Sequence, residues 1–295
     1  RVGIPYPVWR FLHKSAVLVA LIGLAHAWTA GTTLRAHPAL AVLYSALALA
    51  VIGLFAWRNL WVPLRGGRAF QVAAVERETP VDCTLRLAPA HGPPLAHAPG
   101  QFLFVSFPES RTPHDEHPFT IASAPDQPLA LTIRAVGDFT SAVPAVEAGD
   151  PARIEGPFGR FTLAHDAPAA CLFLAGGVGI TPLMSMLRFL RDTRDTRPVV
   201  LLDANRTEER ILFREELASL PDAVQVVHVL SQPGEDWDGP RGHITADLIQ
   251  EYAAAILPQA HAYVCGPPAM MCSVRTALRT LGLPRSRMHW ERFVL

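Results

Sequence analysis

Two long apolar segments near the start of the chain constrain its fold most. Residues 15–34 and 38–57 each give about twenty residues nearly free of charge, the length that crosses a bilayer as a helix. The alternative is a buried helical hairpin in a soluble protein. Such a helix usually keeps a polar face, which neither segment has, so we expect two transmembrane helices.

Basic residues flank these segments unevenly. Three precede the first segment and three follow the second, whereas Arg35 and His37 alone lie between them. Positive residues favour the cytoplasmic side, so both outer ends and the rest of the chain are expected in the cytoplasm. The chain starts at Arg1 without a methionine or a cleavable signal, so we expect a multi-pass membrane protein, in contact with lipid, whose upstream part is missing.

Charge and cysteine content exclude several functions. The 26 basic and 26 acidic residues cancel, so no overall field attracts nucleic acid. The four cysteines have neither the paired spacing of a zinc site nor the clustered spacing of an iron–sulfur loop. We expect no nucleic-acid partner, no sulfur-bound metal and, in a reducing compartment, no disulfide framework.

The rest of the chain shows two successive patterns of apolar and polar residues. Short alternating runs broken by proline and glycine, then apolar strands that alternate with helical stretches, predict an antiparallel β-barrel followed by a doubly wound α/β domain. The predicted domains are a transmembrane helical hairpin at 1–68, the barrel at 69–167 and the α/β domain at 168–295. The predicted strands are 70–75, 83–87, 101–107, 129–136, 171–175, 199–202, 224–230 and 262–264.

A glycine-rich turn follows the first strand of the α/β domain. Gly176, Gly177 and Gly179 precede a helix that starts with Thr181 and Pro182. Glycines let the backbone approach a pyrophosphate, and a helix start offers free amide donors. The spacing differs from G-x-G-x-x-G, so a tight turn without a ligand is the alternative.

A second strand end is expected at the same edge. Cys265, Gly266 and Pro267 follow the strand at 262–264, and carboxyl ends of parallel strands meet where ligands bind. The Cys265 thiol is a candidate to flank a nicotinamide ring, with a small buried hydrophobe as the alternative. The motifs GGVGITP and CGPP resemble the nucleotide-binding half of the ferredoxin–NADP reductase superfamily, and the resemblance runs strongly from about Phe70 to the end.

This resemblance implies an FAD-binding barrel, with a segment that offers an aromatic ring and hydroxyls to a flat isoalloxazine. The segment comprises His117, Pro118, Phe119, Thr120 and Ser123. The superfamily usually has arginine, tyrosine and serine where this chain has His117, Phe119 and Thr120. His-Pro-Phe-Thr resembles the ferric reductase and NADPH oxidase branch, and it implies FAD.

Further stretches resemble FAD contacts of that branch. Ile133, Arg134, Gly137 and Thr140 resemble the stretch that contacts the FAD pyrophosphate, with charge from Arg134. A solvated strand residue is the alternative for Arg134.

Other residues resemble the edges of the family's site. Gly156 and Gly159 resemble the turn at the end of the barrel. In related reductases a terminal aromatic covers the flavin and a nearby carboxylate borders the reacting atoms. Phe293 and Glu291 are the candidates, and with Cys265 they form the predicted catalytic group.

The end of the second α/β strand points to two coenzymes. Asp203 favours NADH if it accepts hydrogen bonds from the ribose 2′-hydroxyl. Arg206, with Thr207 and Arg210, favours NADPH if it holds a 2′-phosphate. We expect NADPH, because Arg206 falls in the loop that a phosphate reaches.

His13 and His26 lie thirteen residues apart near and within the first apolar segment, about 20 Å along a helix. This spacing resembles a histidine-bearing helix of the branch's membrane domain, in which two stacked haems carry electrons. Imidazole is a suitable axial ligand, so each histidine is a candidate ligand of a separate haem b. The alternatives are an interfacial residue for His13 and a packing residue for His26.

The resemblance implies an oxidoreductase that passes electrons from NAD(P)H through FAD to haem and on to a ferric chelate, dioxygen or a quinone. Flavin suits this role because it converts a two-electron donor into one-electron steps. The alternatives are a membrane-anchored reductase that serves a cytoplasmic partner protein, and a flavin-binding sensor or assembly subunit without turnover.

Overall fold

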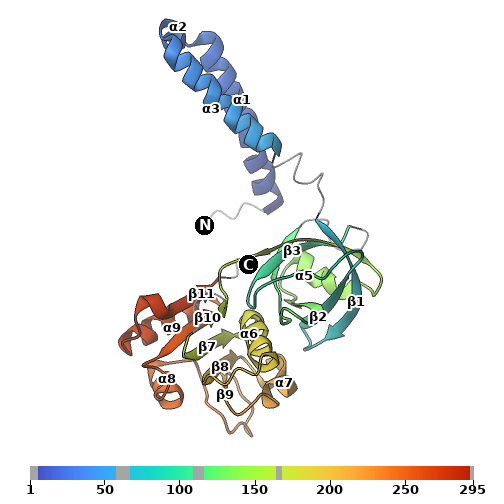
Figure 1. Cartoon of the computed structure of the whole chain (residues 1–295), viewed down its shortest axis with the longest axis vertical. Coiled ribbons are helices and arrows are strands. Elements are labelled where there is room, and N and C mark those ends of the chain that lie inside the picture. Colours follow the sequence, from blue (N-terminus) through green and yellow to red (C-terminus); the bar gives the residue numbers. More distant parts are fainter. Residues whose placement is uncertain (1–5, 58–66, 109–115, 164–167, 293–295) are drawn as a thin grey trace. The chain divides into compact units, whose positions relative to one another are not determined.

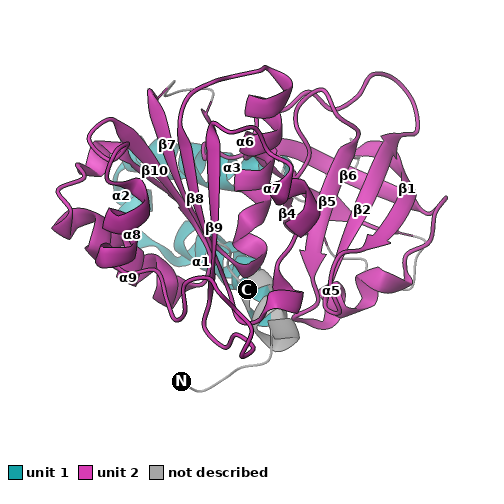
Figure 2. Ribbon diagram, turned by 90° about the horizontal axis from the view of Figure 1, so that it is seen from below, with its two compact units in different colours: residues 1–66 teal, residues 67–295 magenta. Residues whose placement is uncertain are grey.

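The computed structural model describes residues 6–57, 67–108, 116–163 and 168–292 (Figure 1). The chain divides into two compact units, residues 1–66 and residues 67–295, which Figure 2 shows in different colours. The first unit is helical, and the second holds two β-sheets.

The helical unit contains α1 (Tyr6–Ala30), α2 (Thr32–Ala36) and α3 (Pro38–Ala56). The Tyr44 hydroxyl on α3 donates to the Leu24 carbonyl oxygen on α1 at 3.2 Å, which joins the two long helices. The prediction of one helix over 15–34 is wrong at its end. Gly31 is extended, and a Cβ there would lie 2.2 Å from the Ala27 carbonyl oxygen, so a glycine interrupts the helix.

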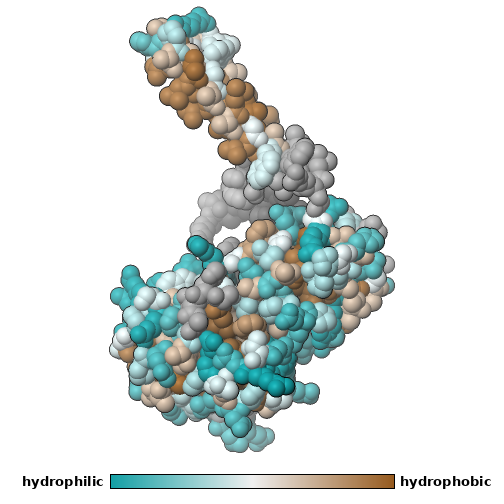
Figure 3. Space-filling view, viewed as in Figure 1, coloured by the Kyte–Doolittle hydropathy of each residue, from teal (hydrophilic) through white to brown (hydrophobic). Residues whose placement is uncertain are grey.

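Large apolar side chains lie exposed along these helices, as Figure 3 shows for one face. Ile22 and Leu49 are each 69% exposed. Among the described residues, α3 is long and apolar enough to cross a membrane, with 19 residues and a mean hydropathy of 2.4. The apolar part of α1, Ser15–Ala30, is shorter.

The first sheet of the second unit is an antiparallel half-barrel, in the order β4-β3-β6-β1-β2-β5. A bridge between Ile121 and Leu131 links the region after β4 to β5. The short helix α5 (Asp138–Ala142) follows β5. The strands are β1 (Arg68–Arg77), β2 (Asp82–Pro89), β3 (Phe102–Ser106), β4 (His117–Thr120), β5 (Leu129–Arg134) and β6 (Pro151–Phe158).

The second sheet is parallel, in the order β11-β10-β7-β8-β9. Its strands are β7 (Ala170–Gly176), β8 (Val199–Asn205), β9 (Val224–Leu230), β10 (Ala260–Cys265) and β11 (Met288–Glu291). The predicted pair of an antiparallel barrel-like sheet and a parallel α/β sheet is confirmed.

Helices cover both faces of the parallel sheet (Figure 2). Leu172 and Leu174 pack in one hydrophobic cluster with α8 (Ala246–Ala253) and α9 (Pro268–Thr280). Phe173 packs on the other face with α6 (Ile180–Asp192) and α7 (Arg214–Ala218). Phe161 and Leu163 of the barrel side join this second cluster, so α6 lies where the two domains meet. The predicted domain boundary at residue 167 lies outside the described residues.

Candidate functional site

The turn after β7 places its glycines against the turn after β10. Gly177 has a φ of +54°, which favours glycine. A Cβ on Gly179 would lie 2.3 Å from the Cys265 carbonyl oxygen, and one on Gly176 would lie 2.4 Å from the Met270 sulfur. In this structure, Gly176 and Gly179 therefore let two turns of the same chain pack closely.

Helix α6 starts directly after this turn. Gly179 is its N-cap and no side chain caps it. The Ile180 N–H donates to the Gly177 and Val178 carbonyl oxygens, and Pro182 has no N–H, so the turn offers an anion the positive end of the helix dipole. Thr181 and Pro182 are buried in that first turn, where the Thr181 hydroxyl donates to the Val178 carbonyl oxygen at 2.9 Å. Thr181 therefore stabilises the turn itself.

Cys265 and Glu291 are register neighbours at the carboxyl ends of β10 and β11. Cys265 is fully buried, and burial together with the nearby Glu291 charge raises the pKa of its thiol well above the ordinary value. Burial also raises the pKa of the Glu291 carboxyl, partly offset by a backbone hydrogen bond from Arg292. Cys265 is thus a protonated thiol that packs in the hydrophobic cluster under α6. Gly266 beside it is buried and Pro267 is exposed, while Phe293 lies outside the described residues.

The predicted flavin segment lies on β4 and the residues after it. The His117 ring stacks on Phe139 of α5, with ring centroids 4.0 Å apart, and Phe119 lies 6.0 Å from the same ring. Pro118 is exposed and Thr120 is buried. Phe139 was not among the predicted site residues, although it lies within the stretch 133–140 that was predicted to contact the pyrophosphate.

Ser123 is fixed by contacts within the protein. Its hydroxyl accepts the Ala130 N–H at 3.1 Å, at the start of β5. Its carbonyl oxygen accepts the Ser185 hydroxyl of α6 at 2.7 Å. The end of the flavin segment is therefore bound to both domains.

Arg134 links the barrel to the glycine turn. Its Nε and Nη2 donate to the buried Asp82 carboxylate at 2.7 and 3.0 Å. A Cβ on Gly177 would come within 2.5 Å of Arg134 Nη1. The interpretation of Arg134 as a solvated strand residue is therefore wrong, because its side chain is 21% exposed and ion-paired.

The remaining residues that were predicted to contact FAD make contacts within the barrel itself. Ile133 is a core residue, and the Thr140 hydroxyl accepts the N–H groups of Val136 and Gly137 at 3.0 and 2.9 Å. Gly156 and Gly159 have positive φ angles, and a Cβ on either would lie 3.0 Å from β3 side chains. These two glycines let the chain pass close to β3.

The two residues that could select the coenzyme, Asp203 and Arg206, differ in their exposure to solvent. Strand β8 runs to Asn205, and Asp203 is 1% exposed within it. Burial raises the pKa of Asp203, opposed by hydrogen bonds from His228 and Asn205. Its carboxylate is held inside the sheet, so the interpretation of Asp203 as a ribose ligand is wrong. Arg206 is exposed in the loop that follows.

The two predicted haem ligands lie on α1. The His26 side chain is exposed, and the side chain of His13 lies outside the described part. The described residues contain no cluster of three or more histidine, cysteine, aspartate or glutamate residues that could hold a metal ion.

The residues at the glycine turn fit a dinucleotide. An uncapped helix start, a left-handed glycine and an arginine guanidinium against the same turn give the positive, close-approach surface that a pyrophosphate needs. The aromatic group of His117, Phe119 and Phe139 offers flat surfaces next to a buried hydroxyl, Thr120.

Family models match both domains. An FAD-binding domain model matches residues 71–168, and an oxidoreductase NAD-binding domain model matches residues 173–276. The chain is 37% identical over 187 residues to ferredoxin–NADP reductase B of Sorangium cellulosum, covering 59% of this chain and 77% of that relative.

One further sequence match is shorter, and one similarity is in the fold. The chain is 32% identical over 157 residues to NADH-cytochrome b5 reductase 1 of Candida glabrata, covering 51% of this chain and 55% of that relative. The chain therefore spans about half the length of that relative. The fold resembles the FAD/NAD-binding domain of nitric oxide dioxygenase from Vibrio cholerae, with a TM-score of 0.69 and 22% identity, covering 78% of this chain and 99% of that chain.

Proposed function

The chain belongs to the ferredoxin–NADP reductase superfamily and is an FAD- and NAD(P)H-dependent oxidoreductase, and we propose that it is a ferric reductase-like or NADPH oxidase-like enzyme. It passes electrons through FAD to haem in the membrane and on to a ferric chelate, dioxygen or a quinone. The observation that carries this proposal is the His117–Thr120 segment in a chain whose helical unit exposes apolar side chains.

Bound FAD would supply the conversion of a hydride into single electrons. The chain supplies the surroundings. The uncapped start of α6 and the Arg134 guanidinium attract the negative phosphates of a dinucleotide. Cys265 keeps its proton, so no thiolate charge lies at the end of β10, and Phe293 is proposed to cover the flavin.

We place the helical unit in the membrane and the reductase domains in the cytoplasm. Arginine residues flank the two apolar segments on their outer ends, as the positive-inside rule requires. His13 and His26 are the proposed ligands of two haems, which need partner ligands from helices beyond this chain. Arg206 supports NADPH as the donor, because it is exposed next to the carboxyl edge of the sheet.

Haem absorbance tests this proposal directly. We expect the full-length protein, purified in detergent, to show a b-type haem spectrum that NADPH reduces. We expect His26→Ala to lose haem, whereas His37→Ala, in the turn after α2, keeps it. A protein without haem, or a His26→Ala variant with unchanged haem content, would contradict the proposal.

One observation favours a membrane-anchored reductase for an acidic partner protein. No acidic residue occurs between residues 252 and 290. Arg275, Arg279, Arg285 and Arg292 are exposed and form no ion pair within the described part of the chain. Trp290, which lines one pocket together with Arg275 and Arg292, is 44% exposed. An unpaired basic surface with an aromatic residue attracts acidic proteins.

Charge reversal separates the two functions. If an acidic protein is the acceptor, Arg275→Glu should lower kcat/KM for reduction of a small acidic ferredoxin and leave reduction of ferricyanide unchanged. An effect that disappears at high salt would support this second function. If wild type and Arg275→Glu reduced the ferredoxin with equal kcat/KM, this second function would be excluded.

A further inference from the structure

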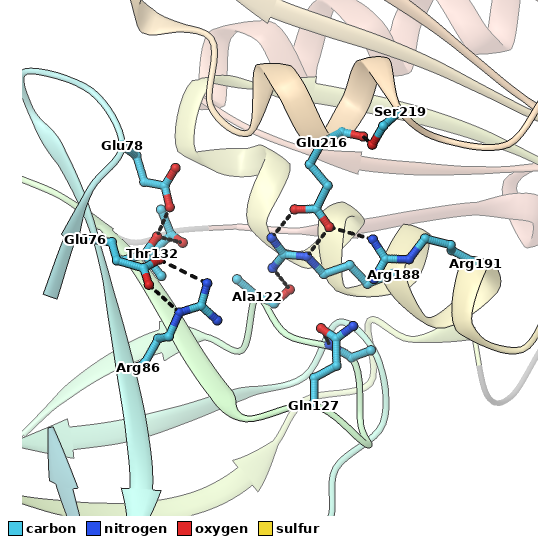
Figure 4. A network of polar contacts seen from close by, with 12 residues as sticks. Glu76, Glu78, Arg86, Ala122, Gln127, Thr132, Arg188, Arg191, Glu216 and Ser219 are labelled. Atoms are coloured by element: carbon cyan, nitrogen blue, oxygen red, sulfur yellow. Dashed lines mark hydrogen bonds and ion pairs between the residues drawn. The ribbon is translucent and has the colours of Figure 1, made fainter. Parts of the chain in front are cut away.

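Helix α6 contacts both parts of the site, and Figure 4 shows one of these contacts, from Arg188 to Ala122. It starts at the glycine turn, and eight residues later Arg188 Nη1 donates to the Ala122 carbonyl oxygen at 2.8 Å. Ser185, one turn earlier, donates its hydroxyl to the Ser123 carbonyl oxygen at 2.7 Å and accepts the Gly100 N–H at 3.3 Å. Ala122 and Ser123 end the predicted flavin segment. One helix thus joins the dinucleotide turn to the flavin segment.

The Arg188 guanidinium has a fixed orientation. Its Nε and Nη2 donate to the two Glu216 carboxylate oxygens at 2.9 and 2.5 Å. Arg191 Nη1 binds the same carboxylate at 2.9 Å, and the Arg188 guanidinium carbon lies 4.9 Å above the centre of the Phe213 ring. The side chain is 12% exposed. Two-point pairing and a ring face leave the guanidinium little freedom.

We infer that Ser185 and Arg188 are positioning residues for hydride transfer, which set the separation between the bound nicotinamide and the bound flavin. The inference rests on the NAD(P)H and FAD reaction of the chain. The segment from the start of α6 to Arg188 spans about 12 Å of helix, and its buried face keeps it rigid. Hydride transfer needs its reacting atoms about 3 to 3.5 Å apart, so a small shift of one domain slows it strongly.

The chain provides a matched control for Arg188. Arg197 also pairs through Nε and Nη2 with one carboxylate, Asp195, at 2.9 and 2.6 Å. Its Nη1 also donates to a backbone carbonyl oxygen, that of Pro168, at 2.9 Å. All three residues belong to the α/β side, so Arg197 makes the same bonds without joining the flavin segment.

A cavity beside Arg188 makes the test practical. It has a volume of about 370 Å³, with Arg86, Arg188, Arg191 and Glu216 in its wall. Shortening Arg188 enlarges this existing space and forces no side chain into a packed core. Arg188→Gln therefore removes the charged contacts without overpacking.

The experiment compares Arg188→Gln with Arg197→Gln in the FAD-loaded full chain. Stopped-flow absorbance would record the rate of flavin reduction at saturating NADPH, and the long-wavelength absorbance band of the stacked nicotinamide and flavin. We expect Arg188→Gln to slow flavin reduction about tenfold or more and to weaken this band, with FAD affinity retained. Arg197→Gln should leave both near wild type.

Equal reduction rates in the two variants would overturn the inference, as would a loss in Arg188→Gln that saturating FAD restores. If Arg188→Gln does not fold, Ser185→Ala is the second variant. It removes the hydroxyl that binds Ser123, and it should slow reduction without changing the KM for NADPH. An unchanged rate there would also overturn the inference. Wild-type protein whose flavin NADPH does not reduce would instead contradict the underlying reaction.

Discussion

Gly177 and Gly179 lie two residues apart in the same turn, yet an added methyl group would meet different neighbours. At Gly179 the new Cβ would lie 2.3 Å from a backbone oxygen, that of Cys265. At Gly177 it would lie 2.5 Å from the end of the Arg134 side chain. Backbone cannot move aside without shifting β10, whereas a guanidinium can.

We therefore expect Gly179→Ala to destabilise the protein by about 1 to 3 kcal/mol, the usual cost of overpacking. Gly177→Ala should cost about 1 to 2 kcal/mol for its left-handed backbone, and it should raise the KM for NADPH by displacing Arg134. Thermal unfolding and steady-state kinetics measure the two effects. A larger rise of KM in a fully stable Gly179→Ala protein would contradict this assignment.

Arg206 carries the prediction on coenzyme choice. If its guanidinium binds a 2′-phosphate, Arg206→Ala should lower kcat/KM for NADPH about tenfold or more, as expected for a lost charge-assisted hydrogen bond. The value for NADH is the internal control and should change little. A wild-type preference for NADH that survives the substitution would refute the prediction.

Two aspartates show which contacts of single residues could not be predicted from the sequence. Motif spacing located the glycine turn and Cys265, because these are local patterns. It left Asp203 open as a ribose ligand, since a strand end does not reveal that His228 on the next strand faces the carboxylate. It also missed Asp82, 52 residues before Arg134, because ion pairs between distant strands depend on register.

The α6–α7 contact predicts how stability changes with pH. Burial raises the pKa of Glu216, but hydrogen bonds and charges of Arg188 and Arg191 outweigh it, and the pKa lies below its ordinary 4.5. A lowered carboxyl pKa contributes stability above the unfolded-state value and loses it as the pH falls through the folded-state value.

Wild type should therefore be more stable than Glu216→Gln above pH 4.5, and the difference should shrink as the pH falls below it. Urea unfolding across this range measures the effect. Glu215→Gln is the control, since Glu215 is exposed and forms no ion pair among the described residues. A constant difference between wild type and Glu216→Gln at all pH values would contradict the prediction.

Element boundaries followed from the sequence where the pattern was strong. The run 224–230, rich in valine, became β9 with the predicted ends. Strand β6 was missed because it contains Pro151, Gly156 and Pro157, which are rare in strand interiors. Strand β11 was missed because its four residues include His289 and Trp290 and pair with one neighbour only, β10. Pairing, rather than propensity, forms such strands.

At the scale of the whole molecule, the two units differ in what their surfaces expose. The helical unit presents apolar side chains, including Val19 and Val42 at 71% exposure. Residues 67–295 form one compact unit with hydrophobic clusters of their own. A unit with its own cores is expected to fold alone, whereas helices that expose this much apolar surface need lipid, detergent or a partner.

We therefore expect residues 67–295, produced alone, to be a yellow protein that binds FAD and oxidises NADPH with ferricyanide at a rate near that of the full chain. The glycine turn, Arg134 and the α6 junction are all contained in this unit, so the first reaction needs nothing from the helices. Residues 1–66 are predicted to be required for membrane association and haem. Flavin absorbance and membrane fractionation of both proteins measure these roles. A colourless, well-folded 67–295 protein would show that the helical unit contributes to the flavin site, whereas membrane association of this shorter protein would show that the anchor lies elsewhere.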